Sequence, residues 1–580
     1  MNPRHVLLCL SLGLLPLGSA SCGSESPDDG NVSDGFGNSG LGGTNLDGGS
    51  GSGGSAPNPS TGGMTTGGTP TLPSTGGIAS GGGPIVPGTG GTTLGGTGGA
   101  GTGGAIEPPS GGVAATGGND EPKSGGSGGT GAGGSETGGA GPEGGTAGGT
   151  ETGGAGLGGS GQVDCSITVA TKSLSAEIPT VGIVEWSTDL PNITEAEIEF
   201  GLDTTYGMTA PVDLTEANYR TPILGMKAGG HTYHFRILAK AGDQICTGQD
   251  DTLPPTGDPP SALPHLTLTP TTTGGLDGGF LVLETFQQAF GTSGDGAAYI
   301  IDADGDFVWW YVVKGFVDLS RARQSYDGKY MWITTVNVMS NTQKMLRVKM
   351  DGSEVQDFTQ EFGNTHHDFA VRSDETIAFM AYGANCDDIK ERSPNGTVTT
   401  IINGATALGA SACHCNAIQY DRSDDTILFS ELDTSSIAKV RRDTHEVVWV
   451  MSSQNSAKAT VTGLSWVNQH GMHVLDGNRL LFFSNGTGPN STAIEAELSL
   501  NGGSGTANQV WSYPSNITVQ YMGDVQRLGN GNTLVTYSTA GEIREVDSSG
   551  AMLQTIQVSG SGNLVGFAEK RRSLYGPPPR

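Results

Sequence analysis

The stretch Ile300-Ile-Asp-Ala-Asp-Gly-Asp-Phe-Val-Trp309 places a polar turn between two apolar runs. Asp302 to Gly305 form the turn, and the β-branched and aromatic residues on either side are typical of paired strands. Turns of this kind, with Asp or Asn near a Gly and often a Trp soon after, recur along the C-terminal half of the chain. The six copies are Asp302–Gly305, Asp351-Gly352, Asn395-Gly396, Asp443 before Trp449, Asn501-Gly502 and Asp547–Gly550.

The spacing of these turns predicts the architecture. Successive copies lie roughly 44 to 58 residues apart, which is the length of a four-stranded propeller blade. Six copies predict six blades, so we expect an all-β fold whose main part is a six-bladed β-propeller over residues 262–575. The alternative, a set of unrelated hairpins in a sandwich, predicts shorter and less regular spacing.

A second β-rich segment precedes the propeller, over residues 163–256. Its alternating runs are Gly182-Ile-Val-Glu-Trp-Ser187, Ala196-Glu-Ile-Glu-Phe-Gly201 and Thr232-Tyr-His-Phe-Arg-Ile-Leu238, and alternation indicates half-buried strands. The segment resembles a fibronectin type III domain in Trp186 and in the run from Ala228 to Ile237, which implies a β-sandwich. Cys165 and Cys246 stand near its two ends, where a disulfide would close the sandwich.

The N-terminal region predicts export and attachment. Residues 1–21 combine Arg4, an apolar run and a small-residue end, the layout of a signal peptide. The end of this stretch resembles a bacterial lipobox, which implies lipidation of Cys22, although Ser19 stands where Leu is usual. An ordinary secretory signal is the alternative. Residues 22–162 are mainly Gly, Ser, Thr, Ala and Pro, and predict a disordered tether. We expect a lipid-anchored protein at the outer membrane or cell surface.

Composition narrows the partners. With 58 acidic and 29 basic residues, the formal net charge of -29 excludes nucleic acid as a natural partner.

Among Cys386, Cys413 and Cys415 at most one disulfide forms, which leaves one thiol. A metal site at Cys413, His414 and Cys415 is the alternative, but two cysteines so close in sequence rarely chelate one zinc, so we expect no metal.

Histidines open a strand in three consecutive repeats. They are His367 in Thr365-His-His-Asp-Phe369, His414 in Cys413-His-Cys-Asn-Ala417 and His470 in Asn468-Gln-His-Gly-Met472. Because the innermost strands of all blades start at one end of the central channel, these side chains are expected to share a pocket. Each taken alone is more often a hydrogen-bonded spacer. His231, His445 and His473 lack this context and are expected at the surface or in packing.

The segment from about Leu266 to Val558 resembles the bacterial arylsulfotransferases, which are cofactor-independent six-bladed propellers. Gln469-His470 matches the family motif whose histidine becomes sulfated. His414 and Asn416 match a His-x-Asn motif, and His366 or His367 matches a further channel histidine. One feature departs from the family: its Ser-x-Arg region, which supplies a sulfate-binding Arg, reads Ser430-Glu-Leu-Asp433 here.

The resemblance implies sulfuryl transfer from a small aryl sulfate to a phenol, without a cofactor. His470 would be the nucleophile, and His414 or His367 would carry the proton of the phenol. Asn416 and His366 would contact the substrate. In place of the missing Arg we expect Arg321, Arg323 or Arg527. The alternative is a non-catalytic surface propeller that binds a ligand or partner, and the acidic Glu431 is its main support.

Overall fold

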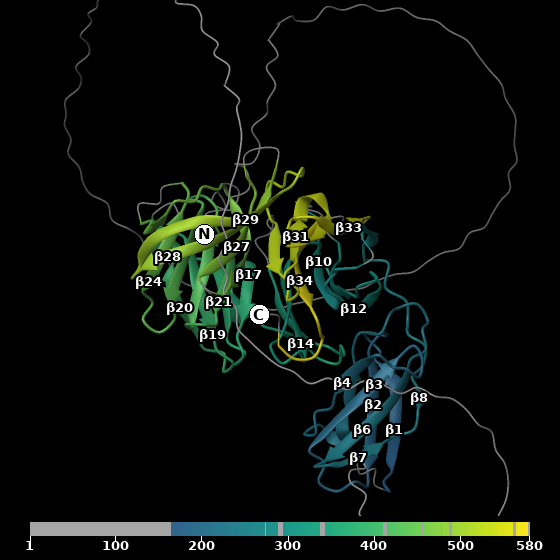
Figure 1. The fold of residues 1–580 in the computed structure, drawn as a ribbon. Coiled ribbons are helices and arrows are strands. Elements are labelled where there is room, and N and C mark those ends of the chain that lie inside the picture. Colours follow the sequence, from purple (N-terminus) through teal and green to yellow (C-terminus); the bar gives the residue numbers. More distant parts are fainter. Residues whose placement is uncertain are drawn as a thin grey trace, which may run out of the picture. The chain divides into compact units, whose positions relative to one another are not determined.

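The computed structural model describes residues 164–577, apart from 273, 288–293, 337–342, 410–413, 455–457, 477, 487–489 and 561–563. Nearly all of the regular structure is β (Figure 1). The helical elements are η1 (Ala217–Tyr219), α2 (Thr359–Phe362), α3 (Gly404–Leu408) and η2 (Ser538–Ala540). No helix in this part of the chain has the length and apolar character needed to cross a membrane. The expected signal peptide, Cys22 and the tether lie outside the described residues.

The N-terminal segment forms two antiparallel sheets. The first contains β1 (Ile167–Leu174), β2 (Gly182–Thr188) and β5 (Thr221–Ile223). The second contains β4 (Met208–Pro211), β3 (Glu195–Gly201), β6 (His234–Ala241), β7 (Gln244–Thr247) and β8 (Asp251–Thr252). One apolar cluster contains fully buried side chains from both sheets, namely Trp186, Ile198 and Phe235. Burying a large apolar side chain stabilises a fold by about 1.5–3 kcal/mol. The membership of a fibronectin type III family stays a prediction.

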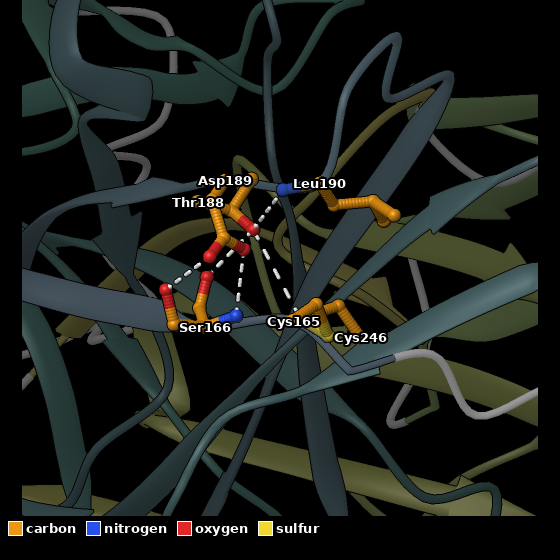
Figure 2. Close-up of a disulfide and its surroundings, with 6 residues drawn as sticks. All are labelled: Cys165, Ser166, Thr188, Asp189, Leu190 and Cys246. Atoms are coloured by element: carbon orange, nitrogen blue, oxygen red, sulfur yellow. Dashed lines mark hydrogen bonds between the residues drawn. A yellow bond between two sulfur atoms is a disulfide. The ribbon is translucent and has the colours of Figure 1, made fainter.

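A disulfide joins Cys165, just before β1, to Cys246 in β7, with 5.9 Å between the Cα atoms. Figure 2 shows how the adjoining chain is held. The carboxylate of Asp189 accepts hydrogen bonds from the backbone N–H and the hydroxyl of Ser166, at 2.7 and 2.8 Å. These contacts fix the start of the domain to the end of β2.

The remaining strands form six antiparallel four-stranded sets. They are β34 (Leu564–Arg571), β10 (Phe280–Phe286), β11 (Gly296–Ile301), β12 (Phe307–Val313); β13 (Leu319–Gln324), β14 (Tyr330–Thr335), β15 (Met345–Lys349), β16 (Val355–Asp357); β17 (Thr365–Val371), β18 (Ile377–Tyr382), β19 (Asp387–Arg392), β20 (Val398–Asn403); β21 (Cys415–Asp421), β22 (Thr426–Glu431), β23 (Ser436–Arg441), β24 (Val447–Ser452); β26 (Gln469–Leu475), β27 (Arg479–Ser484), β28 (Thr492–Asn501), β29 (Ser504–Pro514); and β30 (Asp524–Arg527), β31 (Thr533–Tyr537), β32 (Glu542–Val546), β33 (Met552–Ser559). The short β25 (Val461–Thr462) joins the fourth set to the fifth.

The first strands of these sets form a ring. β34, β13, β17, β21, β26 and β30 contact one another in that order, and β30 contacts β34. The two ends of the segment interlock, because β34 pairs with β10 and β9 (His265–Pro270) pairs with β33. Figure 1 shows the yellow β34 beside the teal β10.

The repeated turns occupy equivalent places in all six sets. Each links the third strand from the ring to the fourth: β11 to β12, β15 to β16, β19 to β20, β23 to β24, β28 to β29 and β32 to β33. The turn spacing therefore follows the sheet repeat. We interpret the sets as the six blades that this repeat predicts, with apolar clusters packed between neighbouring sets.

Candidate active site

The ring strands are irregular where the histidines stand. The pairing register shifts between His366 and Phe369 in β17, between Cys415 and Ala417 in β21, and between His470 and Met472 in β26. Such bulges redirect a side chain relative to a regular strand, and they are frequent beside active sites. A sequence pattern that assumes strict alternation therefore fails at this level of the ring.

Three imidazoles come together at this end of the ring. The ring centroid of His367 lies 5.2 Å from that of His414 and 6.5 Å from that of His470. We refer to His367, His414 and His470 as the histidine cluster. The cluster joins residues that are far apart in the chain, and it resolves which member of the His366-His367 pair faces the other blades: it is His367.

His470 is fully buried and held in one orientation. Its Nδ1 lies 2.7 Å from Oδ1 of Asn485. The Asn485 amide is itself fixed, because its Nδ2 donates to the carbonyl oxygens of Val519 and Met522 at 2.9 and 2.8 Å. Oδ1 can only accept, so Nδ1 of His470 carries the hydrogen and Nε2 carries the lone pair. Desolvation lowers the pKa of His470 to about 3, which leaves the ring neutral near pH 7.

Gly471 follows His470 with φ at +37° and has no room for a side chain. A Cβ there would lie 2.3 Å from Oδ1 of Asp524 and 2.7 Å from the carbonyl oxygen of Gly523. Only glycine permits both this backbone conformation and this approach of β30. The Gly after the Gln-His pair thus brings the neighbouring ring strand against the nucleophile candidate.

His366 adjoins His367 on the side of Asp387, with the two ring centroids 5.0 Å apart. The two Nδ1 atoms are 2.7 Å apart, and the His366 ring stacks on Tyr382 with a centroid distance of 4.1 Å. Nε2 of His366 faces Oδ1 of Asp387 at 3.4 Å. Burial, followed by the neighbouring histidines, lowers the pKa of His367 well below its usual value. His366, expected to touch substrate, contacts His367, Tyr382 and Asp387, and its contact with substrate stays a prediction.

His414 is surrounded by carboxyl groups. Its backbone N–H donates to Oε1 of Glu431 at 3.2 Å, while Asp433 and Asp387 act on its ring electrostatically. Desolvation outweighs these carboxylates and lowers the pKa of His414. The Glu431 carboxyl also accepts hydrogen bonds from the backbone N–H groups of Asp433 and Thr434, at 3.1 and 2.9 Å. Glu431 therefore holds the turn after β22, and burial raises its pKa to about 7.

Asn416 and Gln469 brace the ring strands. The Asn416 amide donates to the carbonyl oxygen of Gln469 at 2.7 Å and accepts from the Ser430 hydroxyl at 2.5 Å. The Gln469 amide donates to the carbonyl oxygen of Glu431 at 2.7 Å and accepts from the Trp466 indole at 2.8 Å. These bonds tie β21 to β26 and fix the backbone just before His470.

The two candidate arginines of β13 are committed to buried carboxylates. Arg321 donates from Nη1 to Asp524 at 2.9 Å, and its Nε lies 3.3 Å from Asp368. Arg323 approaches Asp368 and Glu569 at 3.6 and 3.4 Å. All five groups are buried, so they neutralise one another along the ring. The expectation that either guanidinium replaces the missing family Arg gains no support from these contacts.

Arg527 lies elsewhere. It pairs with Glu495 at 2.5 Å and covers the ring of Trp511, while its backbone N–H donates to Nδ1 of His473 at 2.9 Å. His473 stands three residues beyond His470 in β26, so this contact marks a different level of the strand. The structure does not bring Arg527 into the histidine cluster. His473 is buried in packing, and His231 and His445 are exposed.

Among the described residues, one group of three aspartates has the arrangement of a possible metal site. Cys413 lies outside the described residues, Cys415 is a buried free thiol and Cys386 is in a disulfide. The carboxylate oxygens of the three aspartates lie within 4.8 Å of one another; the residues are Asp302, Asp304 and Asp306. The ammonium of Lys227 already lies 2.6 to 3.2 Å from all three carboxylates.

Sequence reasoning missed Asn485 and Asp387. Asn485 directly follows β27, and its backbone N–H bonds to the carbonyl oxygen of Asn468, just before the Gln-His pair. Asp387 opens β19 and accepts from the backbone N–H of Cys415 at 2.7 Å. No motif marks either residue. Asn485 follows the second strand of its set and Asp387 opens the third strand of its set. Aligning these strands with the strand that begins at the histidine in each repeat would have pointed to both residues.

The chain was compared with curated protein sequences and with solved structures. No curated protein sequence matches the chain. Among solved structures, TolB from Acinetobacter baumannii is 11% identical, covering 60% of this chain and 80% of that chain, with a TM-score of 0.37. Virginiamycin B lyase from Staphylococcus aureus is 12% identical, covering 52% and 98%, with a TM-score of 0.33. These likenesses are too distant to bear on function.

The family comparison reaches the candidate site itself. The family model of arylsulfotransferase (ASST) matches residues 409–570. This stretch contains His414, Asn416 and His470, whereas His366, His367 and the arginines of β13 precede it. Over the strands from β21 nearly to the end of β34, the chain is therefore similar to the arylsulfotransferase family.

Proposed function

We propose that this protein transfers a sulfuryl group from an aryl sulfate ester to a phenolic acceptor, with His470 as the nucleophile. The observation that carries the proposal is the hydrogen bond from Nδ1 of His470 to Asn485, which leaves the lone pair on Nε2. The similarity of residues 409–570 to the arylsulfotransferases supports the same reaction class. It favours an enzyme over a propeller that only binds a ligand.

In the first half-reaction, Nε2 of His470 forms a bond to sulfur while the bond from sulfur to the aryl oxygen breaks. The departing phenolate takes a proton from a neighbouring imidazole and leaves as the phenol. In the second half, an acceptor phenol returns a proton to that imidazole, and its oxygen attacks sulfur as the nitrogen–sulfur bond breaks. Atoms and protons balance over the cycle, and His470 returns to its neutral form.

Burial serves the chemistry at each step. A protonated imidazole has no lone pair on Nε2, so the lowered pKa of His470 keeps the nucleophile available near neutral pH. An aryl sulfate carries one negative charge, which favours protonation of the other imidazoles once it is bound. Transfer of this kind depends mainly on positioning and on stabilising spread negative charge, by analogy with phosphoryl transfer.

The test is release of nitrophenol from 4-nitrophenyl sulfate in the presence of phenol. We expect release by the purified protein, loss of release in His470→Ala, and full release in His445→Gln, which removes an exposed histidine. Mass spectrometry of protein quenched after donor alone should find the added group on a peptide containing His470. Release that is unchanged in His470→Ala would refute the proposal.

We also propose that the protein is exported and anchored through a lipid on Cys22, which rests on the sequence alone. Mass spectrometry of the mature N-terminus tests this. The expected result is a diacylated Cys22, and an unmodified N-terminus at another residue would contradict it.

A further inference from the structure

Behind the histidine cluster, one buried carboxylate and two imidazoles form a continuous row. Oδ1 of Asp387 faces Nε2 of His366 at 3.4 Å, and Nδ1 of His366 lies 2.7 Å from Nδ1 of His367. The His367 ring then contacts the other two members of the cluster. The row therefore runs from a residue that the sequence motifs do not mark to the imidazole that faces the reacting groups.

Hydrogen bonding allows two arrangements of this row. A hydrogen bond between two Nδ1 atoms needs a hydrogen on one and a lone pair on the other. If His366 donates, its Nε2 is bare and its lone pair faces a carboxylate, which is electrostatically unfavourable. If His367 donates, Nε2 of His366 carries hydrogen toward Asp387, and this pairing of opposite partial charges is favourable. The carboxylate therefore selects the arrangement in which His367 donates.

The orientation of the Asp387 carboxylate is also fixed. Its Oδ2 accepts from the backbone N–H of Cys415 at 2.7 Å, so Oδ1 remains for His366. Stacking on Tyr382 holds the His366 ring between its two partners. Asp387 and His366 are both almost fully buried. At 3.4 Å the contact is electrostatic rather than a hydrogen bond, and a carboxylate so placed favours hydrogen on the facing nitrogen and positive charge on the imidazole.

We propose that Asp387 and His366 are positioning residues that make His367 the acid and base of the sulfuryl transfer proposed above. Nδ1–H of His367 is committed to His366, which leaves Nε2 of His367 to exchange the proton with the phenol oxygen. When the aryl sulfate binds, His367 takes a proton on Nε2 and the Asp387 carboxylate balances its charge through His366. That proton leaves with the first phenol and is replaced from the acceptor.

The groups around His367 on the neighbouring elements agree with this role. His414 and His470 face it from the next two ring strands and are neutral near pH 7, because desolvation lowers the pKa of each. Asp433 acts mainly on His414. On its own strand, the carboxylate of Asp368 is already paired with the arginines of β13. Asp387 also acts on His414, and within the described residues it is the carboxylate that faces the His366–His367 pair.

The decisive variant is Asp387→Asn. The N–H of Cys415 will hold the oxygen of the new amide, so its NH₂ group will face His366. Nε2 of His366 must then accept, its Nδ1 must donate, and Nε2 of His367 loses its lone pair. General acid catalysis is typically worth about 10²–10⁴-fold. The loss should fall on substrates whose leaving group needs a proton.

Two donors separate this role from a structural one. With phenyl sulfate, whose phenol has a pKa of about 10, as for tyrosine, Asp387→Asn should lower kcat/KM by about a hundredfold or more. With 4-nitrophenyl sulfate, a better leaving group, the loss should stay below about tenfold. Glu431→Gln is the matched control, since it neutralises a buried carboxyl near the cluster outside the row, and it should affect both donors equally. Equal losses on both donors in Asp387→Asn would overturn the proposal.

A second measurement does not depend on turnover. Nitrogen NMR of the histidine rings, assigned with His366→Gln and His367→Gln, should find hydrogen on Nε2 of His366 and on Nδ1 of His367 in the resting protein. A bare Nε2 on His366 would overturn the row even in an active enzyme. If wild-type protein releases no phenol from either donor, the proposed function fails, and the ring protonation still decides whether the row exists.

Discussion

Replacing Asn485 with leucine should separate the orientation of His470 from the packing around it. Asn485→Leu keeps a side chain of similar size but removes the acceptor for Nδ1 of His470. It also removes the donors to the carbonyl oxygens of Val519 and Met522. The nucleophile then loses the partner that keeps hydrogen on Nδ1 and the lone pair on Nε2.

The magnitude follows from these three bonds. A partner that orients a metal-bound histidine is typically worth about 10–100-fold in activity; we take the same range for Asn485, which is about 1.4–2.7 kcal/mol of transition-state free energy at 1.36 kcal/mol per tenfold. The buried carbonyl oxygen of Met522 loses the donor from Asn485, which costs about 1–3 kcal/mol of folding stability, whereas that of Val519 keeps the Ser491 hydroxyl at 3.3 Å. We therefore expect Asn485→Leu to lower kcat by about 10–100-fold and to lower the free energy of unfolding by about 1–3 kcal/mol.

Asn485→Asp is the matched variant. One oxygen of the new carboxyl still accepts from Nδ1 of His470, whereas the donors to the two carbonyls are lost. We expect a loss of stability like that of Asn485→Leu but a higher kcat, because the tautomer of His470 is kept. Turnover is measured with 4-nitrophenyl sulfate and phenol below the unfolding temperature, and stability by urea unfolding. Equal turnover in the two variants would refute the tautomer argument, and wild-type turnover in Asn485→Leu would refute any role for this bond.

Two further predictions concern stability. Arg321→Gln leaves the buried carboxylate of Asp524 without its partner, so the free energy of unfolding should fall by about 3–5 kcal/mol in urea titrations, and a loss below about 1 kcal/mol would contradict the buried ion pair. Because burial lowers the pKa of His470 from 6.5 to about 3, the unfolded chain binds a proton that the folded chain does not. Stability should therefore fall as pH drops below about 6.5, by up to 1.4 kcal/mol per pH unit for this group. Stability measured from pH 7 to pH 5 should show a shallower decline in His470→Asn, and an equal slope would contradict a neutral buried His470.

The strand order of the propeller segment was accessible to sequence reasoning because turn chemistry repeats with the sheets. A tight turn needs Asp, Asn or Gly at defined places, so a copy from Asp302 to Gly305 predicts its equivalents elsewhere. Each copy falls between the third and fourth strands of its set. The gathering of His414 and His470 follows from the same register, since each stands where a ring strand begins.

The finer geometry of the site depends on contacts that have no local pattern. His366 and His367 cannot be told apart by alternation, because β17 bulges between His366 and Phe369 and φ of His367 is +55°. The engagement of Arg321 with Asp524 joins residues 203 positions apart. The amide of Asn485 is oriented toward His470 by two carbonyl groups from the segment before β30, and no local sequence pattern marks that contact. Sequence reasoning named the candidate reacting groups, whereas the residues that orient them become visible only in the fold.

The acidic residue in the family's arginine region weighs less against catalysis than the sequence suggests. Both oxygens of the Glu431 carboxyl accept hydrogen bonds. Oε1 accepts from the backbone N–H groups of His414 and Asp433, and Oε2 accepts from the backbone N–H and hydroxyl of Thr434. The carboxyl therefore faces the turn after β22. Desolvation raises its pKa to about 7, which favours the uncharged form more than in an exposed glutamate. No contact among the described residues brings an arginine into the histidine cluster, and the arginines of β13 are paired with buried carboxylates. In the proposed reaction, a proton on the histidine cluster is then the positive charge available to the sulfate ester, which is why the row behind His367 bears on that reaction as well as on the fold.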